Sequence, residues 1–565
     1  MRPSLRDRFG DRLIPLSLVA LTLLSYARLY MLRDAYADDN CWLLAIYIGD
    51  GFRDFLASGW SELRRVPQGT FYYFYLLPFR YMQDPYALWH TVSLATEVGL
   101  ALLLYKLVRN LCEDAWLAGF VACTMIAVPL DHVVPYVTSA NYRLGTLAAL
   151  ASLYLTDTAA REGRWGWRLP AALLLAVIGE WVFTEAALGY EPARLLIVWN
   201  RFYRPGRPMR EYIAPLAKWL ALFALLGIGL VVYKLTFKPY GIYAGMYATG
   251  LSRLLDREAL AGTERLFSLG LWRLLRHEQS FGHPESAVLG VLAGALTFCI
   301  LLAFRRSPAA KGAVPAPRSS RLFLFLLGVV MLLPVLFLFH YAGRPPRLGT
   351  DSNHATIMQP GYALLLGAGV HWIALRAASA ARVAFLALAL ALGWFAGSGV
   401  YYSNLNLDFF AVASARQQEF LGAFKKRFPS PPQHADFVID AVPPRYSPRL
   451  ETFFQFEDIH ASYELELGLN RLYAPGALHG ERRYRAYPIE EMTADYRAKG
   501  PAMFRSTFMR DSHYGKDALD FSQMTYVYWR GGRVLVNREI LQENPRALYR
   551  ELADKPPPSW AAPAE

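Results

Sequence analysis

Two adjacent carboxylates, Asp38 and Asp39, follow directly after the first long apolar run of the chain. A carboxylate at a membrane surface can act as a general base toward a lipid head group, provided that it lies within hydrogen-bond reach of the proton it removes. The same placement also suits a simpler role, in which both residues solvate a loop or cap the following helix. The pattern therefore predicts either a catalytic pair or a structural pair.

Basic side chains at the ends of apolar runs form a second group of candidates. An Arg or Lys at such a position can neutralise the charge of a departing phosphate. Long basic side chains also mark membrane boundaries by reaching toward water, so each has an alternative role without chemistry. The candidates for phosphate binding are Arg65, Arg143, Lys234, Lys238, Arg344 and Arg347.

Asp131 and His132 stand at the end of the third apolar run, where they could support acid–base chemistry, contact an acceptor or cap a helix. Asp38, Asp39, Asp131 and Asp351 could also gather around a divalent cation. We expect a site without a metal or another cofactor, and a divalent metal is the alternative. No pair of cysteines has metal-ligand spacing, among Cys41, Cys112, Cys123 and Cys299.

The composition predicts that a helical membrane protein positions these residues. Of 565 residues, 54% are hydrophobic and 19% are charged, against about 25% charged in soluble proteins. The excess of 59 Lys and Arg over 46 Asp and Glu is scattered over short loops, which argues against nucleic acid as a partner. About eleven apolar runs are long enough to approach a membrane span: 13–32, 87–109, 115–135, 142–158, 169–183, 185–199, 214–235, 285–304, 322–341, 357–375 and 383–402.

Basic residues in the loops predict the orientation of these spans. With a cytoplasmic N-terminus, every short inside connection is basic, as the positive-inside rule requires. The first run, 13–32, is too long for the core of a signal peptide, so we expect it to be retained. The predicted domains are a transmembrane domain over 1–402, with long outside loops 33–86 and 236–284, and a soluble extracytoplasmic domain over 403–565.

The last part of the chain reads as a small α/β domain. A helix is expected over 411–428, a strand over 436–441 and two strands within 525–536 around Gly531 and Gly532. Residues 555–565 are rich in Pro and Ala and are expected to be disordered. In the outside loops, residues 42–60 suit an interfacial helix and residues 238–281 suit a pair of amphipathic helices.

Several short stretches follow one another in an order known from a family of membrane enzymes. They are Asp38-Asp39 after the first span, Arg65-Val66-Pro67 with Tyr72-Tyr73, Trp89–Leu94, Pro129–Arg143, Phe183–Ala186, Leu332–Val335 and His354–Gly369. This order resembles the GT-C superfamily of glycosyltransferases that use polyprenyl-phosphate sugars, and within it the protein O-mannosyltransferases and their bacterial relatives. The resemblance covers roughly residues 13–402 and departs at Asn353-His354-Ala355, where relatives often carry an Arg-Tyr pair.

The resemblance implies an enzyme that moves a sugar from a polyprenyl phosphate or diphosphate to a lipid, glycan or protein acceptor on the extracytoplasmic face. It also implies that Asp38 or Asp39 is the general base. High Arg and Ala content and the lack of organelle signals fit a bacterial inner membrane.

Three rival hypotheses remain. A polymerase or ligase of lipid-linked saccharides is disfavoured by the acidic pair after the first span. A secondary transporter is disfavoured because the sequence has no convincing internal repeat. The third is a non-catalytic scaffold with the same fold.

Overall fold

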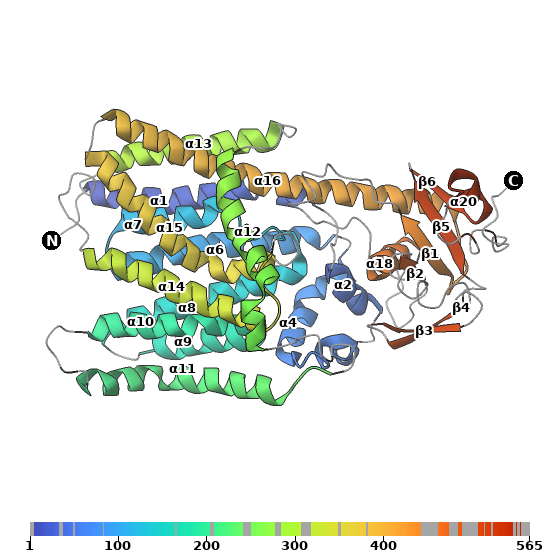
Figure 1. Ribbon diagram of the computed structural model, residues 1–565, viewed down its shortest axis with the longest axis horizontal. Helices are drawn as coiled ribbons and strands as arrows, with labels where there is room; N and C mark the ends of the chain where they lie inside the picture. Colours follow the sequence, from blue (N-terminus) through green and yellow to red (C-terminus); the bar gives the residue numbers. More distant parts are fainter. Residues whose placement is uncertain are drawn as a thin grey trace.

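The computed structural model is an α-helical bundle followed by a smaller α/β unit (Figure 1). It describes residues 5–32, 38–48, 51–82, 84–163, 166–203, 208, 210–240, 244, 250–276, 284–306, 318–347, 352–379, 382–441, 462–473, 484–488, 507–512, 515–520, 524–530, 532–545, 550 and 554. The predicted tail 555–565 and the candidate metal ligand Asp351 lie outside this part of the chain.

The helices of the bundle run roughly alongside one another, and their predominantly apolar sequences allow them to bury side chains against each other or to face lipid. Their bounds are α1 (Leu5–Ser25), η1 (Leu29–Met31), α6 (Tyr86–Cys112), α7 (Ala115–Ala127), η3 (Val137–Ser139), α8 (Ala140–Glu162), α9 (Arg168–Val177), η4 (Ile178–Phe183), η5 (Glu185–Tyr190), α10 (Glu191–Phe202), α11 (Arg210–Thr236), α13 (Pro284–Arg305), α14 (Arg318–Tyr341), α15 (Asn353–Ser379) and α16 (Arg382–Arg427).

The prediction of a helical polytopic membrane protein is confirmed. Within the described residues, 7 helices are long and apolar enough to cross a membrane by their length and composition. They cover Arg12–Met31, Tyr86–Cys112, Leu216–Thr236, Pro284–Arg305, Arg321–Tyr341, Asn353–Ala378 and Arg382–Arg427.

The other four predicted spans coincide with helices that are shorter or more polar. The run 115–135 gives only the 13-residue helix α7, and its remainder is largely non-helical. The run 142–158 gives α8, whose 23 residues include buried polar side chains such as Arg143 and Asp157. The runs 169–183 and 185–199 form a hairpin, in which α9 and η4 lead to a turn at Thr184 and η5 and α10 return.

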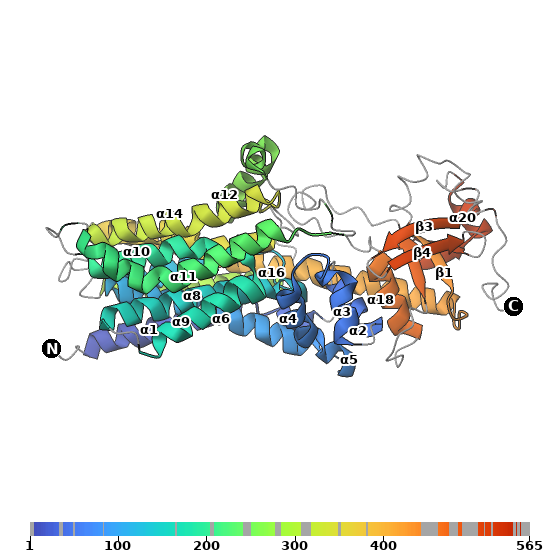
Figure 2. The ribbon, with the colours of Figure 1, turned by 90° about the horizontal axis from the view of Figure 1, so that it is seen from below.

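Helix α16 continues through the predicted domain boundary at residues 402 and 403. Its 46 residues give a length of about 69 Å, roughly twice the thickness of the bilayer core. The helix therefore leaves the bundle and carries the C-terminal α/β unit on its far end (Figures 1 and 2). Phe420, Phe424 and Phe428 at that end pack against the sheet in a core of its own.

The C-terminal α/β unit contains a four-stranded sheet in the order β2-β1-β5-β6. Strand β1 pairs in parallel with β2 and β5, while β5 and β6 form an antiparallel hairpin, as the sequence predicts. A separate antiparallel pair is formed by β3 and β4. The bounds are β1 (Asp436–Ala441), α18 (Ser462–Tyr473), β2 (Arg485–Pro488), β3 (Thr507–Ser512), β4 (Gly515–Asp520), β5 (Thr525–Arg530), β6 (Arg533–Val536) and α20 (Arg538–Glu543).

Short helices of the first long loop lie between the bundle and the C-terminal α/β unit (Figure 2). They are α2 (Asp38–Ile48), α3 (Phe52–Phe55), η2 (Leu56–Trp60), α4 (Val66–Leu76) and α5 (Pro78–Tyr81). The single interfacial helix predicted over 42–60 is thus divided into several, with Gly51 at a φ of 147° just before α3. In the other long loop, η7 (Leu251–Leu255) precedes α12 (Arg257–Arg276), which crosses the bundle at its periphery (Figure 1).

Candidate functional site

The two aspartates of the first loop have different positions. Asp39 is fully buried, and its carboxylate accepts three hydrogen bonds from the first two residues of η3. The amide of Val137 donates to Oδ2 at 2.9 Å, while the amide and the hydroxyl of Thr138 donate to Oδ1 at 2.7 and 2.6 Å. Asp39 therefore fastens the beginning of α2 to the loop between α7 and α8.

Asp38 is the first residue of α2, and its side chain lies outside the described part of the molecule. Its backbone position follows from the bonds of Asp39, because the two residues are adjacent. A carboxylate at the first position of a helix is also favoured by the helix dipole. The hydrogen bonds of Asp39 thus explain a structural role for this residue. They assign no role to Asp38, which is the other member of the predicted pair.

Arg143 and Asp131 form a buried network instead of an exposed one. The guanidinium of Arg143 is fully buried and lies 3.2 Å from Asp131 Oδ2, 3.0 Å from Ser139 Oγ and 3.2 Å from Ser93 Oγ. Its Nε lies 4.0 Å from a carboxylate oxygen of Glu97. Because a buried charge needs such partners, this position favours a structural role for Arg143 over the expected phosphate contact.

Asp131 and His132 connect the α7–α8 loop to the last helices of the bundle. Asp131 also accepts a bond from the hydroxyl of Thr356 at 2.8 Å, and the His132 amide donates to Ser352 Oγ at 2.9 Å. The carbonyl of His132 accepts from Asn406 of α16. Both residues are buried, and these contacts favour a structural role over contact with an acceptor.

Arg65 and Lys234 meet at a single carboxylate, that of Glu185. Arg65 Nε lies 3.1 Å from Glu185 Oε1, and Lys234 forms an ion pair with the same oxygen. The three side chains come from the start of α4, the end of α11 and the turn between η4 and η5. They retain exposed fractions of 26%, 32% and 23% for Arg65, Lys234 and Glu185 respectively. All three side chains are partly exposed, so an anion can approach the two cations.

Helix α4 joins this cationic cluster to the aspartate loop. At its first turn, Gln68 Nε2 donates to the carbonyl of Phe183 at 2.7 Å, close to Glu185. One turn later, the Tyr72 hydroxyl donates to the carbonyl of Thr138, the residue that Asp39 binds. Seven residues separate Arg65 from Tyr72, and an α-helix rises 1.5 Å per residue, which gives about 10 Å between the two ends.

Burial keeps Tyr72 in its neutral form. The loss of solvent raises the pKa of its hydroxyl well above the ordinary value, and the neighbouring tyrosines and the Asp39 carboxylate add to this shift. The hydroxyl therefore remains a hydrogen-bond donor and holds α4 against the Thr138 carbonyl.

The remaining predicted cations divide between two places. Arg344 acts electrostatically on His354, as Arg65 does, so these three residues lie in one neighbourhood. The ring of His354 stacks on Phe339 with a centroid distance of 4.4 Å. Arg347 instead packs against Gly262 of α12, and Lys238 follows the end of α11. The structure thus brings together Arg65 and Lys234, whereas Arg143 lies in the buried network with Asp131 and Arg347 lies against α12.

Glu185, Gln68 and His354 are not among the residues that the sequence predicts for the site. Their signals were present but ambiguous: Glu185 follows a predicted break between two short spans, and Gln68 lies three residues after Arg65. His354 stands where the resemblance to the GT-C enzymes fails. Spacing alone does not show that these three residues converge on one end of the bundle.

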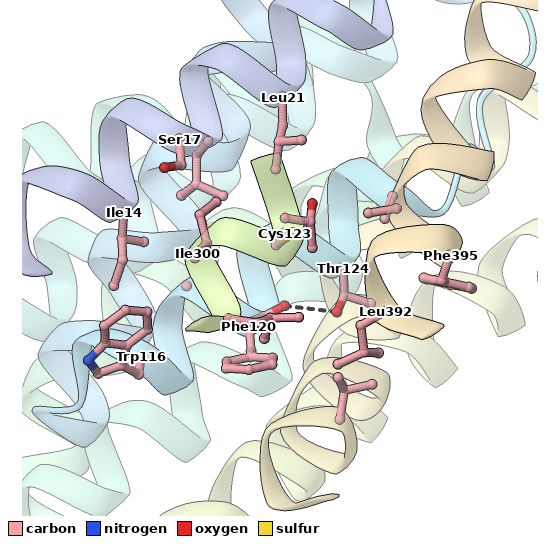
Figure 3. Close-up of a pocket in the computed structure, with 17 residues that line it drawn as sticks. Ile14, Ser17, Leu21, Trp116, Phe120, Cys123, Thr124, Ile300, Leu392 and Phe395 are labelled. Atoms are coloured by element: carbon pink, nitrogen blue, oxygen red, sulfur yellow. Dashed lines mark hydrogen bonds between the residues drawn. The ribbon is translucent and has the colours of Figure 1, made fainter. Parts of the chain in front are cut away.

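An apolar cavity of about 70 Å³ lies elsewhere, among α1, α7, α13, α15 and α16 (Figure 3). None of the described residues that line it carries a charge, and the hydroxyl of Thr124 is bonded to the carbonyl of Phe120. It therefore offers no acid–base or phosphate-binding group. Among the residues whose placement is described, no group of three or more His, Cys, Asp and Glu side chains could hold a metal ion.

No model of a known protein family, no curated protein and no solved structure matches this chain.

Proposed function

We propose that the protein is a membrane glycosyltransferase with a lipid-linked sugar donor, and that Asp38 is its general base. In this reaction the hydroxyl oxygen of the acceptor attacks C1 of the sugar, and the bond from C1 to the phosphate oxygen breaks. Asp38 takes the proton of the hydroxyl, and the lipid phosphate departs with the electron pair. The donor is a polyprenyl phosphate or diphosphate sugar, in line with the sequence resemblance.

The observation that supports this proposal best is that α4 connects a cluster of two cations at its start with the loop that binds Asp39. The helix has the cationic cluster of Arg65, Lys234 and Glu185 at its start, and it contacts the loop that holds Asp39 at the next turns. Arg65 and Tyr72 are about 10 Å apart along the helix axis, and the proposal places the sugar ring between the cationic cluster and the loop to which Tyr72 and Asp39 are bonded.

The cationic cluster is the proposed phosphate site. Two hydrogen-bonding cations stabilise the negative charge that develops on the departing phosphate, because such bonds are stronger than neutral ones. Glu185 keeps the two cations in place and reduces their repulsion in the absence of donor. The proposal adds Arg344 to this site, because its charge, like that of Arg65, acts on His354.

The proposal includes eleven membrane crossings with a cytoplasmic N-terminus, in a bacterial inner membrane. Helices α7, α8 and the hairpin of α9 to α10 lie within the bundle beside the seven apolar helices (Figure 1). The start of α1 and the C-terminal α/β unit lie at opposite ends of the bundle, which fits an odd number of crossings. The C-terminal α/β unit and the proposed catalytic loop are then both extracytoplasmic.

The experiment is transfer of a radiolabelled sugar from a panel of synthetic polyprenyl-phosphate sugars to membrane extracts. We expect the wild type to consume one donor and Asp38→Asn to lose transfer at equal expression. Asp54→Asn is the matched control, because Asp54 is an exposed carboxylate of the same loop. Full activity of Asp38→Asn would contradict its assignment as the general base. No use of any donor by the wild type would contradict the glycosyltransferase proposal and favour a scaffold or a transporter.

A further inference from the structure

Helix α18 of the C-terminal α/β unit packs directly on α2, the helix that begins at Asp38. Leu467 is 2% exposed and belongs to the same apolar cluster as Leu43 and Leu44 of α2. The Tyr47 hydroxyl of α2 donates to the carbonyl of Asn470 at 3.4 Å. Residues more than 400 positions apart in the chain thus share one buried contact.

Arg471 extends this contact to the beginning of the second span. Its guanidinium donates to the Tyr86 hydroxyl at 3.2 Å and lies 5.0 Å from the centre of the Phe79 ring. Such a position combines a hydrogen bond with a cation–π interaction. Arg471 therefore fixes α18 to α5 and α6, beside the place where Leu467 meets α2.

A neighbouring side of α18, about 100° around the helix, is bonded to the sheet. The buried carboxylate of Glu466 accepts from the amide of Ala486 in β2 at 3.3 Å. The Asn470 amide group donates to the carbonyl of Tyr484 at 2.8 Å and accepts from its amide at 3.3 Å. With polar bonds to the sheet and apolar contact to α2, α18 can transmit the position of the sheet to the start of α2.

We propose that α18 is the positioning element of α2: the C-terminal α/β unit, through Leu467 and Arg471, holds in place the helix that carries Asp38. Asp39 fastens one end of α2 to the α7–α8 loop, the other short helices of the first long loop pack beside it, and α18 covers the face that carries Leu43 and Leu44. Without α18, α2 would lose this cover and would open more readily from its remaining contacts. The consequence for catalysis rests on the proposed function, but the movement of α2 does not.

Cys41 provides a direct readout of that movement. It lies on α2, is only 5% exposed, and is three residues after Asp38. With Cys112, Cys123 and Cys299 replaced by Ala, a charged, water-soluble maleimide reports whether α2 is displaced in the full-length protein in its membrane. The variants are Leu467→Asp and Arg471→Ala.

We expect Cys41 to react about tenfold faster in Arg471→Ala, because the lost hydrogen bond and cation–π contact favour local opening by that factor. The effect of Leu467→Asp should be larger, since it places a charge in a buried apolar contact. Arg471→Lys keeps the cation over the ring and should restore most of the protection. Arg533→Ala, at an exposed ion pair with Glu543 in the same unit, should match the wild type.

Equal reaction rates in the wild type, Arg471→Ala and Leu467→Asp would overturn the proposal, whether or not the protein transfers a sugar. A loss of folding by Leu467→Asp would appear as aggregation in detergent, and the milder Arg471→Ala and Arg471→Lys pair would then decide. Where transfer is measurable, kcat should fall in Arg471→Ala while the KM of the donor stays constant, because the proposed phosphate site lies on α4 and α11. If the wild type transfers no sugar, the glycosyltransferase proposal fails and the Cys41 rates still decide on α18.

Discussion

Replacement of each loop aspartate by Asn should separate catalysis from folding. In Asp39→Asn the side chain keeps one acceptor oxygen for Thr138, but its amide group now faces the amide of Val137, which is also a donor. The substitution removes the charge from three hydrogen bonds and leaves a buried N–H without an acceptor. Hydrogen bonds to charged groups are individually worth about 1.5–3 kcal/mol, so we expect a loss of about 2–4 kcal/mol in the free energy of unfolding.

Asp38→Asn should have the opposite result. Asp38 begins a helix, and loss of its charge there costs less than about 1 kcal/mol. Removal of a general base lowers the rate of transfer by about 100- to 10,000-fold. The assay combines thermal unfolding in detergent, followed by tryptophan fluorescence, with sugar transfer per folded molecule.

A combined result decides the assignment. A stable but inactive Asp39→Asn, together with an active Asp38→Asn, would make Asp39 the base and refute the reasoning from its hydrogen bonds. Residual transfer in Asp39→Asn that follows the folded fraction would support a structural role.

Three further predictions concern the phosphate site, the packing of the bundle and the role of metal. Arg65→Ala and Lys234→Ala should each raise the KM of the donor about tenfold or more, because each loses a charge-assisted bond to the phosphate; steady-state kinetics measure this. Gly367→Ala should destabilise the bundle by about 1–3 kcal/mol, because an added Cβ would lie 2.5 Å from the Cα of Val121. In Gly369→Ala, in the same helix, the added Cβ meets nothing within 4 Å, so this control should be neutral. Thermal unfolding compares the two variants. Addition of a chelator should leave the transfer rate unchanged, and a loss restored by a divalent cation would contradict the metal-free site.

The fold could be predicted from the sequence where one physical effect dominates. Apolar runs near the thickness of a bilayer marked the long helices, and alternating residues with a Gly pair marked the β5–β6 hairpin. The end of the last span was not predictable, because Asn404, Asn406 and Asp408 interrupt the apolar run. In the structure the amide groups of Asn404 and Asn406 donate to the carbonyls of Leu24 and His132, and Asp408 pairs with Arg28. These partners from other segments allow α16 to continue without a break.

The candidate site was only partly predictable for a related reason. From the sequence, Arg65, Lys234 and Arg143 are equivalent candidates for phosphate binding, because each is placed at the end of an apolar run. Their difference lies in their partners, which come from distant parts of the chain: Arg143 is enclosed by Asp131 and Ser139, while Arg65 and Lys234 remain partly exposed. No local sequence pattern shows whether the partners of a cation enclose it or leave it partly exposed.

Helix α4 shows what local spacing does encode. Arg65, Gln68 and Tyr72 follow one another at intervals of three and four residues, which places them on one face of a helix. That face meets Glu185 at its first turn and Thr138 at the next. The spacing of Arg65, Gln68 and Tyr72 along α4 therefore sets the distance between the cationic cluster and the loop that Asp39 binds. Insertion of one residue between Gln68 and Tyr72 would turn Tyr72 by about 100° and separate the two ends, which should abolish transfer even with both Arg65 and Asp38 present.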